Sequence, residues 1–251
     1  MKKLFNEAAC IVEDSLVVAD LHLGVERELL SSGLVVPSMR ESMQKRLLEL
    51  IKRTGVDRLV ILGDLKHSIV KTTWKEHKEV SGLVAALKEE VDVVLVKGNH
   101  DSAIETLLPG VEVVDHLVLG ETLLVHGHRR APGMGFKRIL TAHNHPAVEF
   151  VDPLGARLRE KVWLELVLKE EAVQRFRLDI SPRITVMPAF NELIEGRAFN
   201  LEPGGQGPLL REELVDVGEA EVFLLDGTEL GRLRDLAEFC SGLPPGRREE
   251  Q

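Results

Sequence analysis

The sequence has few cysteines, no long apolar run and no excess of positive charge. Its two cysteines, Cys10 and Cys240, lie far apart, which favours a reducing compartment over a disulfide-stapled secreted fold. The longest apolar runs have only the length of a strand, so we expect no membrane-spanning segment. The formal net charge of −9 excludes an overall basic field that would attract nucleic acid, although a local patch could serve.

The amino terminus offers little evidence of a targeting signal. The first five residues could begin a signal peptide, but Glu7, Glu13 and Asp14 interrupt any apolar stretch behind them. We therefore expect a cytoplasmic protein. The 251 residues, 44% of them hydrophobic, can bury a sizeable core. We expect one domain over residues 1–243 and a disordered tail over residues 244–251.

Apolar runs alternate with helical patterns through the first hundred residues. The runs 16–19, 59–62 and 91–96 predict buried strands, and strands joined by helical crossovers form a parallel sheet. Two helices are expected between them, each opened by a capping box, Ser38 with Glu41 and Thr73 with Glu76. Their predicted core-facing stripes are Met43, Leu47, Leu50 and Ile51 in the first helix, and Trp74, Val80, Val84 and Leu87 in the second.

The pattern changes in the second part of the chain. Runs at 117–119, 123–125 and 139–142 predict short strands, and Asp101 is expected to cap a short helix over residues 102–108. After residue 146, the runs 148–151, 162–168, 184–187 and 222–225 read as strands without long helices between them. We expect a second sheet packed on the first, with Pro188 to Phe190 returning near the functional site.

Five polar motifs each follow an apolar run. They are Asp20-Leu21-His22, Gly63-Asp64, Gly98-Asn99-His100-Asp101, His126-Gly127-His128 and His143-Asn144-His145. Ligands of parallel α/β sheets bind at the carboxyl ends of the strands, so these motifs should converge in space. Each motif alone has an ordinary reading, as a helix cap, a turn or a solvated histidine pair. Their coincidence at five strand ends favours a metal site.

The side chains that should converge are two carboxylates, one amide and four imidazoles. The expected ligands are Asp20, His22, Asp64, Asn99, His126, His143 and His145. Mixed nitrogen and oxygen donors suit Mn²⁺, Fe²⁺, Co²⁺, Ni²⁺ or Zn²⁺ better than Ca²⁺ or Mg²⁺. Seven donors are too many for one ion and suit two. Neither cysteine is near, so a thiolate zinc site is not expected.

Residues 16 to about 150 resemble the calcineurin-like metallophosphoesterase superfamily, motif by motif. The stretches 19–24, 62–68 and 187–191, with His145-Pro146, look most like the DNA ligase-associated metallophosphoesterases and their archaeal relatives. The resemblance implies an α/β fold, a two-sheet αββα sandwich with the metal site at strand carboxyl ends. One departure is Ala142, where the superfamily usually has glycine.

The resemblance also implies how the ligands divide between two ions. Asp20, His22, Asp64 and His145 would bind the first ion, and Asp64 would bridge to the second. The second would be completed by Asn99, His126 and His143. Whether His126 or His128 is the ligand stays open, and His126 is preferred because it stands directly at the strand end.

A two-ion site predicts a mechanism for phosphate-ester hydrolysis. Two ions can clamp phosphoryl oxygens and lower the pKa of a shared water, whose hydroxide attacks phosphorus in line. His100 is adjacent to a ligand and is expected to protonate the leaving oxygen as general acid. Arg129 and Arg130 would contact the substrate phosphate, or belong to a solvated loop. His67 is a further substrate-site candidate, against the alternative of a solvated histidine.

We therefore expect a phosphodiesterase that acts on a nucleotide or nucleic acid, with two divalent ions and Mn²⁺ as the first choice. A second hypothesis is a phosphomonoesterase or pyrophosphohydrolase of a small phosphorylated metabolite. A third is a non-catalytic, metal-binding subunit of a DNA repair complex, with a helicase or ligase as partner by family resemblance. Substrate identity and oligomeric state stay open at this stage.

Overall fold

The first of two β-sheets contains the strands that were predicted to run parallel. The computed structural model describes residues 1–70, 72–152 and 154–240. Six strands are ordered β1-β2-β3-β4-β5-β6, and β3 to β6 run parallel, as predicted for this part of the chain. Their bounds are Lys2–Lys3, Ala9–Val12, Ser15–Val18, Arg58–Leu62, Asp92–Val96 and Glu112–Val114.

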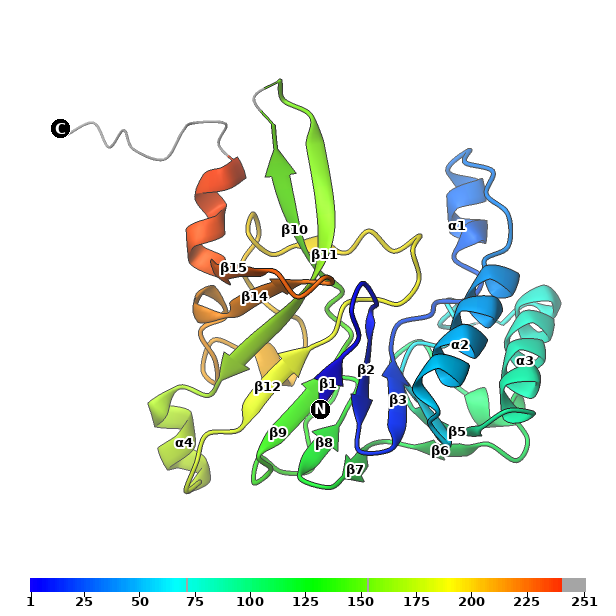
Figure 1. The fold of residues 1–251 in the computed structure, drawn as a ribbon, viewed down its shortest axis with the longest axis horizontal. Helices are drawn as coiled ribbons and strands as arrows, with labels where there is room; N and C mark the ends of the chain where they lie inside the picture. Colours follow the sequence, from blue (N-terminus) through cyan, green and yellow to red (C-terminus); the bar gives the residue numbers. More distant parts are fainter. Residues whose placement is uncertain (71, 153, 241–251) are drawn as a thin grey trace.

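Helices α2 (Arg40–Thr54) and α3 (Trp74–Lys88) cover the outer face of this sheet (Figure 1). The predicted stripe of α2 is buried, and Gly55 ends that helix in the left-handed conformation. The Thr73–Glu76 capping box is present. Ser38 was wrong as a cap, because α2 begins at Arg40 and the Ser38 hydroxyl donates to Glu79 instead. Trp74 was wrong as a core residue, because its position at the start of α3 leaves it 78% exposed.

The second sheet packs face to face against the first. Its strands are ordered β13-β10-β11-β12-β9-β8-β7, and β14 and β15 extend it from β11. Leu62 of the first sheet and Leu124, Leu140 and Trp163 of the second share one buried cluster. The strand bounds are Leu117–Leu119, Thr122–Leu124, Arg138–Thr141, Pro146–Val151, Arg157–Val167, Arg183–Val186, Arg197–Ala198, Glu221–Leu224 and Glu229–Arg232.

Short helical segments cover the outer face of the second sheet. They are α4 and the 3₁₀ helices η2, η3 and η4, over Glu170–Phe176, Pro208–Leu210, Val217–Glu219 and Leu233–Cys240. Residues of this layer form a separate core with the sheet, including Ala172, Leu209, Val217 and Leu236. The fold is therefore the expected α/β arrangement of two packed sheets between helical layers, with a thin layer on this side.

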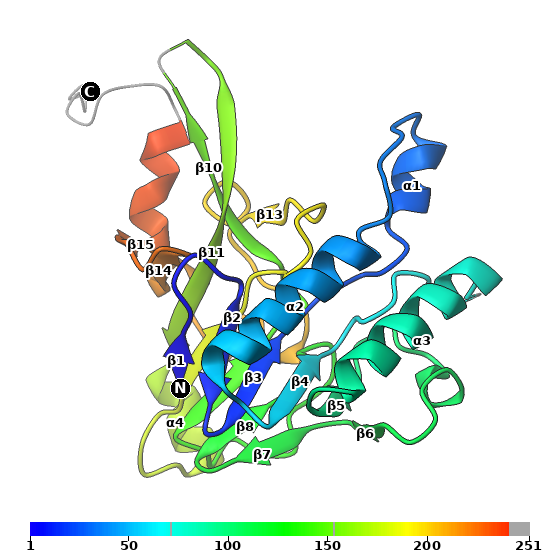
Figure 2. The ribbon, with the colours of Figure 1, turned by 45° about the vertical axis from the view of Figure 1, so that its right-hand side comes forward.

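Two parts of the chain project from the packed sheets. Figures 1 and 2 show that the hairpin of β10 and the first half of β11 extends away from the body, as does α1 (Glu26–Ser31). No helix in the described ranges combines the length and apolarity that crossing a bilayer requires. The predicted tail over residues 244–251 lies outside the described residues.

Candidate metal centre and active site

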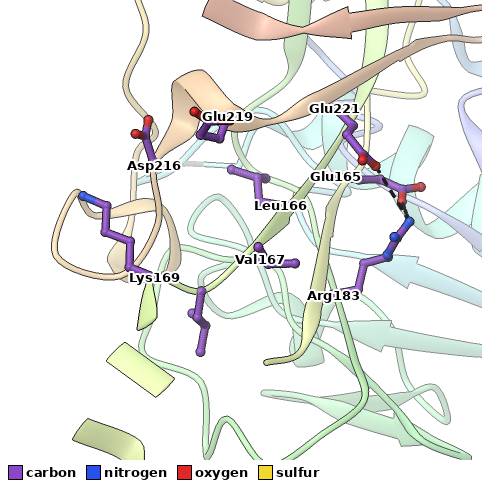
Figure 3. Close-up of a pocket in the computed structure, with 9 residues that line it drawn as sticks. Glu165, Leu166, Val167, Lys169, Arg183, Asp216, Glu219 and Glu221 are labelled. Carbon is purple, nitrogen blue, oxygen red and sulfur yellow. Dashed lines mark hydrogen bonds and ion pairs between the residues drawn. The ribbon is translucent and has the colours of Figure 1, made fainter. Parts of the chain in front are cut away.

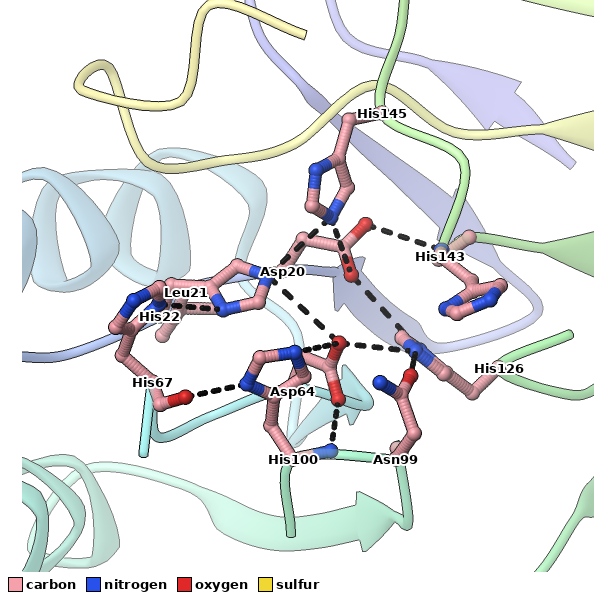
Figure 4. A network of polar contacts seen from close by, with 12 residues as sticks. Asp20, Leu21, His22, Asp64, His67, Asn99, His100, His126, His143 and His145 are labelled. Carbon is pink, nitrogen blue, oxygen red and sulfur yellow. Dashed lines mark hydrogen bonds and ion pairs between the residues drawn. The ribbon is translucent and has the colours of Figure 1, made fainter. Parts of the chain in front are cut away.

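The five predicted motifs lie at strand carboxyl ends and meet between the two sheets. Asp20, Asp64 and Asn99 follow β3, β4 and β5 of the first sheet, whereas His126 and His143 follow β8 and β9 of the second. Because both sheets direct these ends to one place, motifs spread over 126 residues of sequence become neighbours (Figure 4).

Several residues of the motifs have a strained, left-handed backbone conformation. Nine non-glycine residues of the described chain have positive φ, and five of them belong to the motifs. These five are Asp20, His22, Asp64, His143 and His145. Left-handed conformations of such residues are costly and persist where the surrounding structure imposes them, commonly at functional sites.

Two clusters of donor atoms share one carboxylate. The first contains Asp20, His22, Asp64 and His145, and the second contains Asp64, His126 and His143, each with donor atoms within 4.8 Å of one another. In the first, His22 Nε2 lies 3.2 Å from His145 Nε2 and 3.7 Å from Asp64 Oδ2. In the second, His126 Nε2 lies 3.2 Å from Asp64 Oδ2, and 3.3 Å from Asn99 Oδ1.

A carboxylate oxygen of the first cluster lacks a hydrogen-bond donor within the described part of the chain, as a metal ligand would in the absence of its ion. Oδ1 of Asp20 is buried and has no hydrogen bond in favourable geometry among the described residues. His145 Nε2 and His126 Nδ1 stand 3.3 and 3.8 Å from it. A buried carboxylate oxygen without a donor is costly, and converging lone pairs of imidazole and carboxylate are what a divalent ion satisfies.

Burial and mutual attraction shift the acid–base properties of these groups. Burial lowers the pKa of His22 to about 3 and that of His143 to about 4. Burial also opposes ionisation of Asp20 and Asp64, but the neighbouring histidines outweigh it and hold both carboxyl pKa values below their ordinary range. Although burial disfavours its charged form, His126 has a pKa raised to about 9 by Asp64 and Asp20.

The structure distinguishes His126 from His128 as a donor. His126 Nδ1 lies 2.9 Å from the Leu62 carbonyl, which can only accept, so Nδ1 carries the proton and Nε2 faces Asp64. His128 belongs to neither donor cluster, and both its ring nitrogens lack hydrogen-bond partners among the described residues. The geometry therefore favours His126, the residue preferred from its place at the strand end.

His67 is hydrogen-bonded between Glu28 of α1 and His22. Its Nε2 lies 2.6 Å from Glu28 Oε2, and its Nδ1 lies 3.3 Å from His22 Nδ1. With both rings neutral, His67 donates to the carboxylate from Nε2 and accepts from His22 Nδ1. This arrangement leaves the lone pair of His22 on Nε2, the nitrogen that faces the donor cluster.

His100 is held by its ring and by its backbone. Its Nδ1 donates to the carbonyl of His67, and its backbone N–H donates to Asp64 Oδ1 over 2.8 Å. Its Nε2 stands 4.0 Å from Asp64 Oδ2, beside both clusters. The ring therefore presents Nε2 to the space in which a substrate of this site would bind.

Asp101 was wrong as a helix cap. The segment after it forms only the 3₁₀ helix η1 (Ile104–Thr106), and Ala103 occupies the capping position. The fully buried carboxylate instead accepts hydrogen bonds from the backbone N–H groups of Asp64, Leu65 and Gly98. It thus joins the loop after β4 to the loop after β5.

A cavity of about 500 Å³ opens over the donor clusters. Asp64, Asn99, His100, His143 and His145 line it together with Arg159, Arg197 and Gln206. Arg159 comes from the projecting hairpin, where it donates to Glu149 over 2.7 Å and to the Gly196 carbonyl over 3.1 Å. Arg159 and Arg197 were not predicted from the sequence, because no local motif marks them. Arg129 and Arg130 line a separate cavity that includes His126 and His128.

A family model of calcineurin-like phosphoesterases matches residues 15–185 of this sequence. The chain belongs to the calcineurin-like phosphoesterase family. It is a hydrolase of phosphate esters, and the family together with the histidine–aspartate clusters indicates divalent metal ions. As the resemblance implied, this calcineurin-like phosphoesterase is a metallophosphoesterase.

A solved structure shares the architecture of this calcineurin-like phosphoesterase. A nuclease, MPE, from Pseudomonas putida is 24% identical with a TM-score of 0.55, covering 90% of this chain and 94% of that one. YfcE, a phosphoesterase from E. coli, is 16% identical with a TM-score of 0.37, covering 87% and 97%. The first similarity supports the fold, and the second is too low to carry an argument. No curated protein matches the sequence.

Proposed function

We propose that this protein is a dinuclear metal-dependent phosphodiesterase that hydrolyses a nucleotide or nucleic-acid phosphodiester. The observation that supports this best is the pair of donor clusters sharing Asp64, with His100 Nε2 beside them. Two-ion sites of this kind serve in-line displacement at phosphorus. A nuclease shares the fold over nine-tenths of the chain, which is our reason for placing nucleic acid first among substrates.

The proposed ligands divide as the two clusters do. Asp20, His22, Asp64 and His145 would hold one ion, and Asp64, Asn99, His126 and His143 would hold the other. Mn²⁺ is our first choice, with Fe²⁺, Co²⁺, Ni²⁺ and Zn²⁺ as chemical alternatives for mixed nitrogen and oxygen donors. Bound ions supply positive charge at the phosphoryl oxygens and make water more acidic.

His100 is the proposed general acid. Because the His67 carbonyl holds the Nδ1 proton, a second proton on Nε2 is the one available to the leaving oxygen. General acid catalysis typically contributes about 10²–10⁴-fold. Arg159 and Arg197, which line the same cavity, are proposed to hold the non-reacting phosphate oxygens.

Paired substrates and matched variants test the proposal. With Mn²⁺, bis-p-nitrophenyl phosphate should be hydrolysed faster than p-nitrophenyl phosphate. Asp64→Asn should abolish turnover, whereas Asp57→Asn, an exposed carboxylate before the same strand, should not. His100→Ala should lower turnover about 10²–10⁴-fold with two Mn²⁺ still bound, and the exposed His77→Ala serves as its control.

Each of the other possible results of these assays would favour a different conclusion. Unchanged activity in both Asp64→Asn and His100→Ala would refute the proposed mechanism. Faster hydrolysis of the monoester would instead favour a phosphomonoesterase of a small metabolite. Mn²⁺ binding without turnover of either ester, together with co-purification of a helicase or ligase, would favour a subunit of a repair complex. The cytoplasm is the proposed location, because both cysteines suit a reducing compartment.

A further inference from the structure

A phosphodiesterase that acts on nucleic acid needs cationic surface near its site, yet this chain carries a net charge of −9. Another cavity, called the arginine cavity below, supplies such a surface. It has a volume of about 410 Å³ and lies between the loop 130–134, the end of α4 and the segment 208–214. That volume is within the range of small-molecule sites in proteins.

The arginines of this cavity have no acidic partner among the described residues. Arg130, Arg175 and Arg211 line it, and none has an ion pair or side-chain hydrogen bond with another described residue. Glu213 is the only carboxylate among the described residues that line it. Three guanidinium groups around one hollow repel each other, and a polyanion would relieve that repulsion.

A further cavity, of about 240 Å³, shows the opposite arrangement. It is rich in carboxylates (Figure 3), and these are matched by arginines. Glu165 and Glu221 pair with Arg183, and Glu219 lies 2.6 Å from Arg232. Because its carboxylates already have arginine partners, that cavity offers little to a cationic ligand.

The arginine cavity adjoins the metal centre through one short segment. Gln206 lines the cavity over the donor clusters, and its backbone N–H donates to Asn144 Oδ1 over 2.6 Å. Gly207 packs closely against the Gly127 carbonyl, and a Cβ at position 207 would stand 2.2 Å from that oxygen. Pro208 then begins the arginine cavity. An extended chain rises at most about 3.6 Å per residue, so the two steps from Gln206 to Pro208 span at most about 7 Å.

The arginine cavity also has an aromatic wall and a fixed apolar floor. Phe176 is 40% exposed at its edge, with the Arg175 guanidinium 5.9 Å from the centre of the ring. Met134 and Leu209 form the floor and belong to the buried core of the second sheet. Unpaired arginines with an accessible aromatic face are the features by which proteins bind single-stranded nucleic acid.

We propose that this cavity binds the single-stranded segment that flanks the scissile phosphodiester. Arg130 receives the phosphate next to the metal centre, Arg175 and Arg211 bind the phosphates beyond it, and Phe176 stacks on a base. The inference rests on the proposed function and names its substrate class as a single-stranded oligonucleotide.

Binding without turnover tests the cavity directly. A fluorescein-labelled single-stranded oligonucleotide is titrated with the full chain in EDTA, and anisotropy is followed over a range of salt concentrations. Arg175→Ala/Arg211→Ala should weaken binding about tenfold or more and reduce the slope of log Kd against log salt by about 1.4, because each single-strand phosphate contact contributes about 0.7. Arg53→Ala, an exposed arginine at the end of α2, should change neither.

The aromatic contact has its own variants. Phe176→Ala should weaken binding of the single strand about fivefold or more, and Phe176→Leu should not restore it, because stacking needs a ring. A duplex of the same sequence should bind without dependence on Phe176. Circular dichroism and melting curves confirm that the variants are folded.

Turnover separates this inference from the proposed function. The double arginine variant should lose about tenfold more kcat/KM toward the oligonucleotide than toward bis-p-nitrophenyl phosphate. If wild type hydrolyses the small diester but the arginine variants bind the oligonucleotide as wild type does, the inference is overturned and the proposed function stands. If the variants lose binding but wild type hydrolyses no diester, the proposed function fails while the cavity remains an anion site.

Discussion

The buried ammonium group of Lys66 donates hydrogen bonds to the backbone carbonyls of His100 and Ser68. It joins the same two loops that the carboxylate of Asp101 joins through their N–H groups. The backbone around Asp64 and His100 is therefore held in two ways. Asp101 accepts hydrogen bonds from its N–H groups, and Lys66 donates hydrogen bonds to its carbonyl groups. A buried lysine is costly, and its pKa is lowered by that burial, so its retention fits a positioning role.

Replacing Lys66 should impair the step that needs His100. Lys66→Met removes the donor groups and should lower kcat about 10–100-fold, because small displacements of a catalytic group carry costs of that size. The loss should be larger for esters with poor leaving groups, which depend most on protonation. Lys97→Met, which removes an exposed pair with Glu105, is the control. A Lys66→Met/His100→Ala variant should be no slower than His100→Ala, and additive losses would contradict the positioning role.

The Glu28–His67–His22 contacts should influence metal affinity. His67→Ala removes the acceptor that keeps the proton on His22 Nδ1, and partners of this type change metal affinity about 10–100-fold. Calorimetric titration with Mn²⁺ should show the loss at one of two sites, with a smaller loss in Glu28→Gln. Glu41→Gln, an exposed change on α2, provides the control. Wild-type Mn²⁺ affinity in His67→Ala would contradict this role and leave His67 as a candidate substrate contact.

Metal binding should release a proton below about pH 9. The pKa of His126 is raised from 6.5 to about 9 in the metal-free protein, so its Nε2 is protonated at neutral pH and must lose that proton to become a ligand. Mn²⁺ affinity should therefore rise about tenfold per pH unit up to about pH 9. Titrations at pH 7.5 in buffers of different ionisation enthalpy measure the proton count, and a count of zero would contradict this assignment.

The stability of the metal-free protein should pass through a maximum between acid and alkaline pH. His126 has a folded pKa above its unfolded value, so its contribution is complete below about pH 6.5 and is lost as pH rises through about 9. His22 and His143 have lowered pKa values, so their neutral burial destabilises the fold as pH falls from about 6.5 toward 4. Melting temperatures in EDTA should fall on both sides, and a flat profile would contradict these shifts.

Gly98 should tolerate no side chain. A Cβ at this position would stand 2.1 Å from Asp64 Oδ1, the carboxylate shared by both donor clusters. Gly98→Ala should therefore displace Asp64, abolish detectable turnover and reduce bound Mn²⁺. Gly135→Ala is the matched control, since nothing lies within 4 Å of a Cβ there. Assays of turnover and bound metal compare the two variants, and an active Gly98→Ala protein would show that Asp64 can move without loss.

The sequence by itself determined where the strands end and which polar groups stand at those ends. Each of the five motifs follows an apolar run, and parallel strands bring their carboxyl ends together whatever the intervening sequence. That local logic predicted the parallel part of the first sheet, the second sheet and the gathering of Asp20, Asp64 and His143. It also predicted the buried stripe of α2 from helical spacing.

Only the tertiary structure decided how the surroundings of the site are built. Asp101 looked like a helix cap because a cap is the usual local use of its side chain, but its partners are loops brought close by packing of β4 and β5. No local pattern marks Lys66 or Arg159 as site residues, and each makes a contact with a residue distant in sequence, 34 positions away for Lys66 and 37 for Arg159. The donors of the metal centre follow from short-range periodicity, whereas the groups that orient them depend on long-range contacts that exist only in the folded chain.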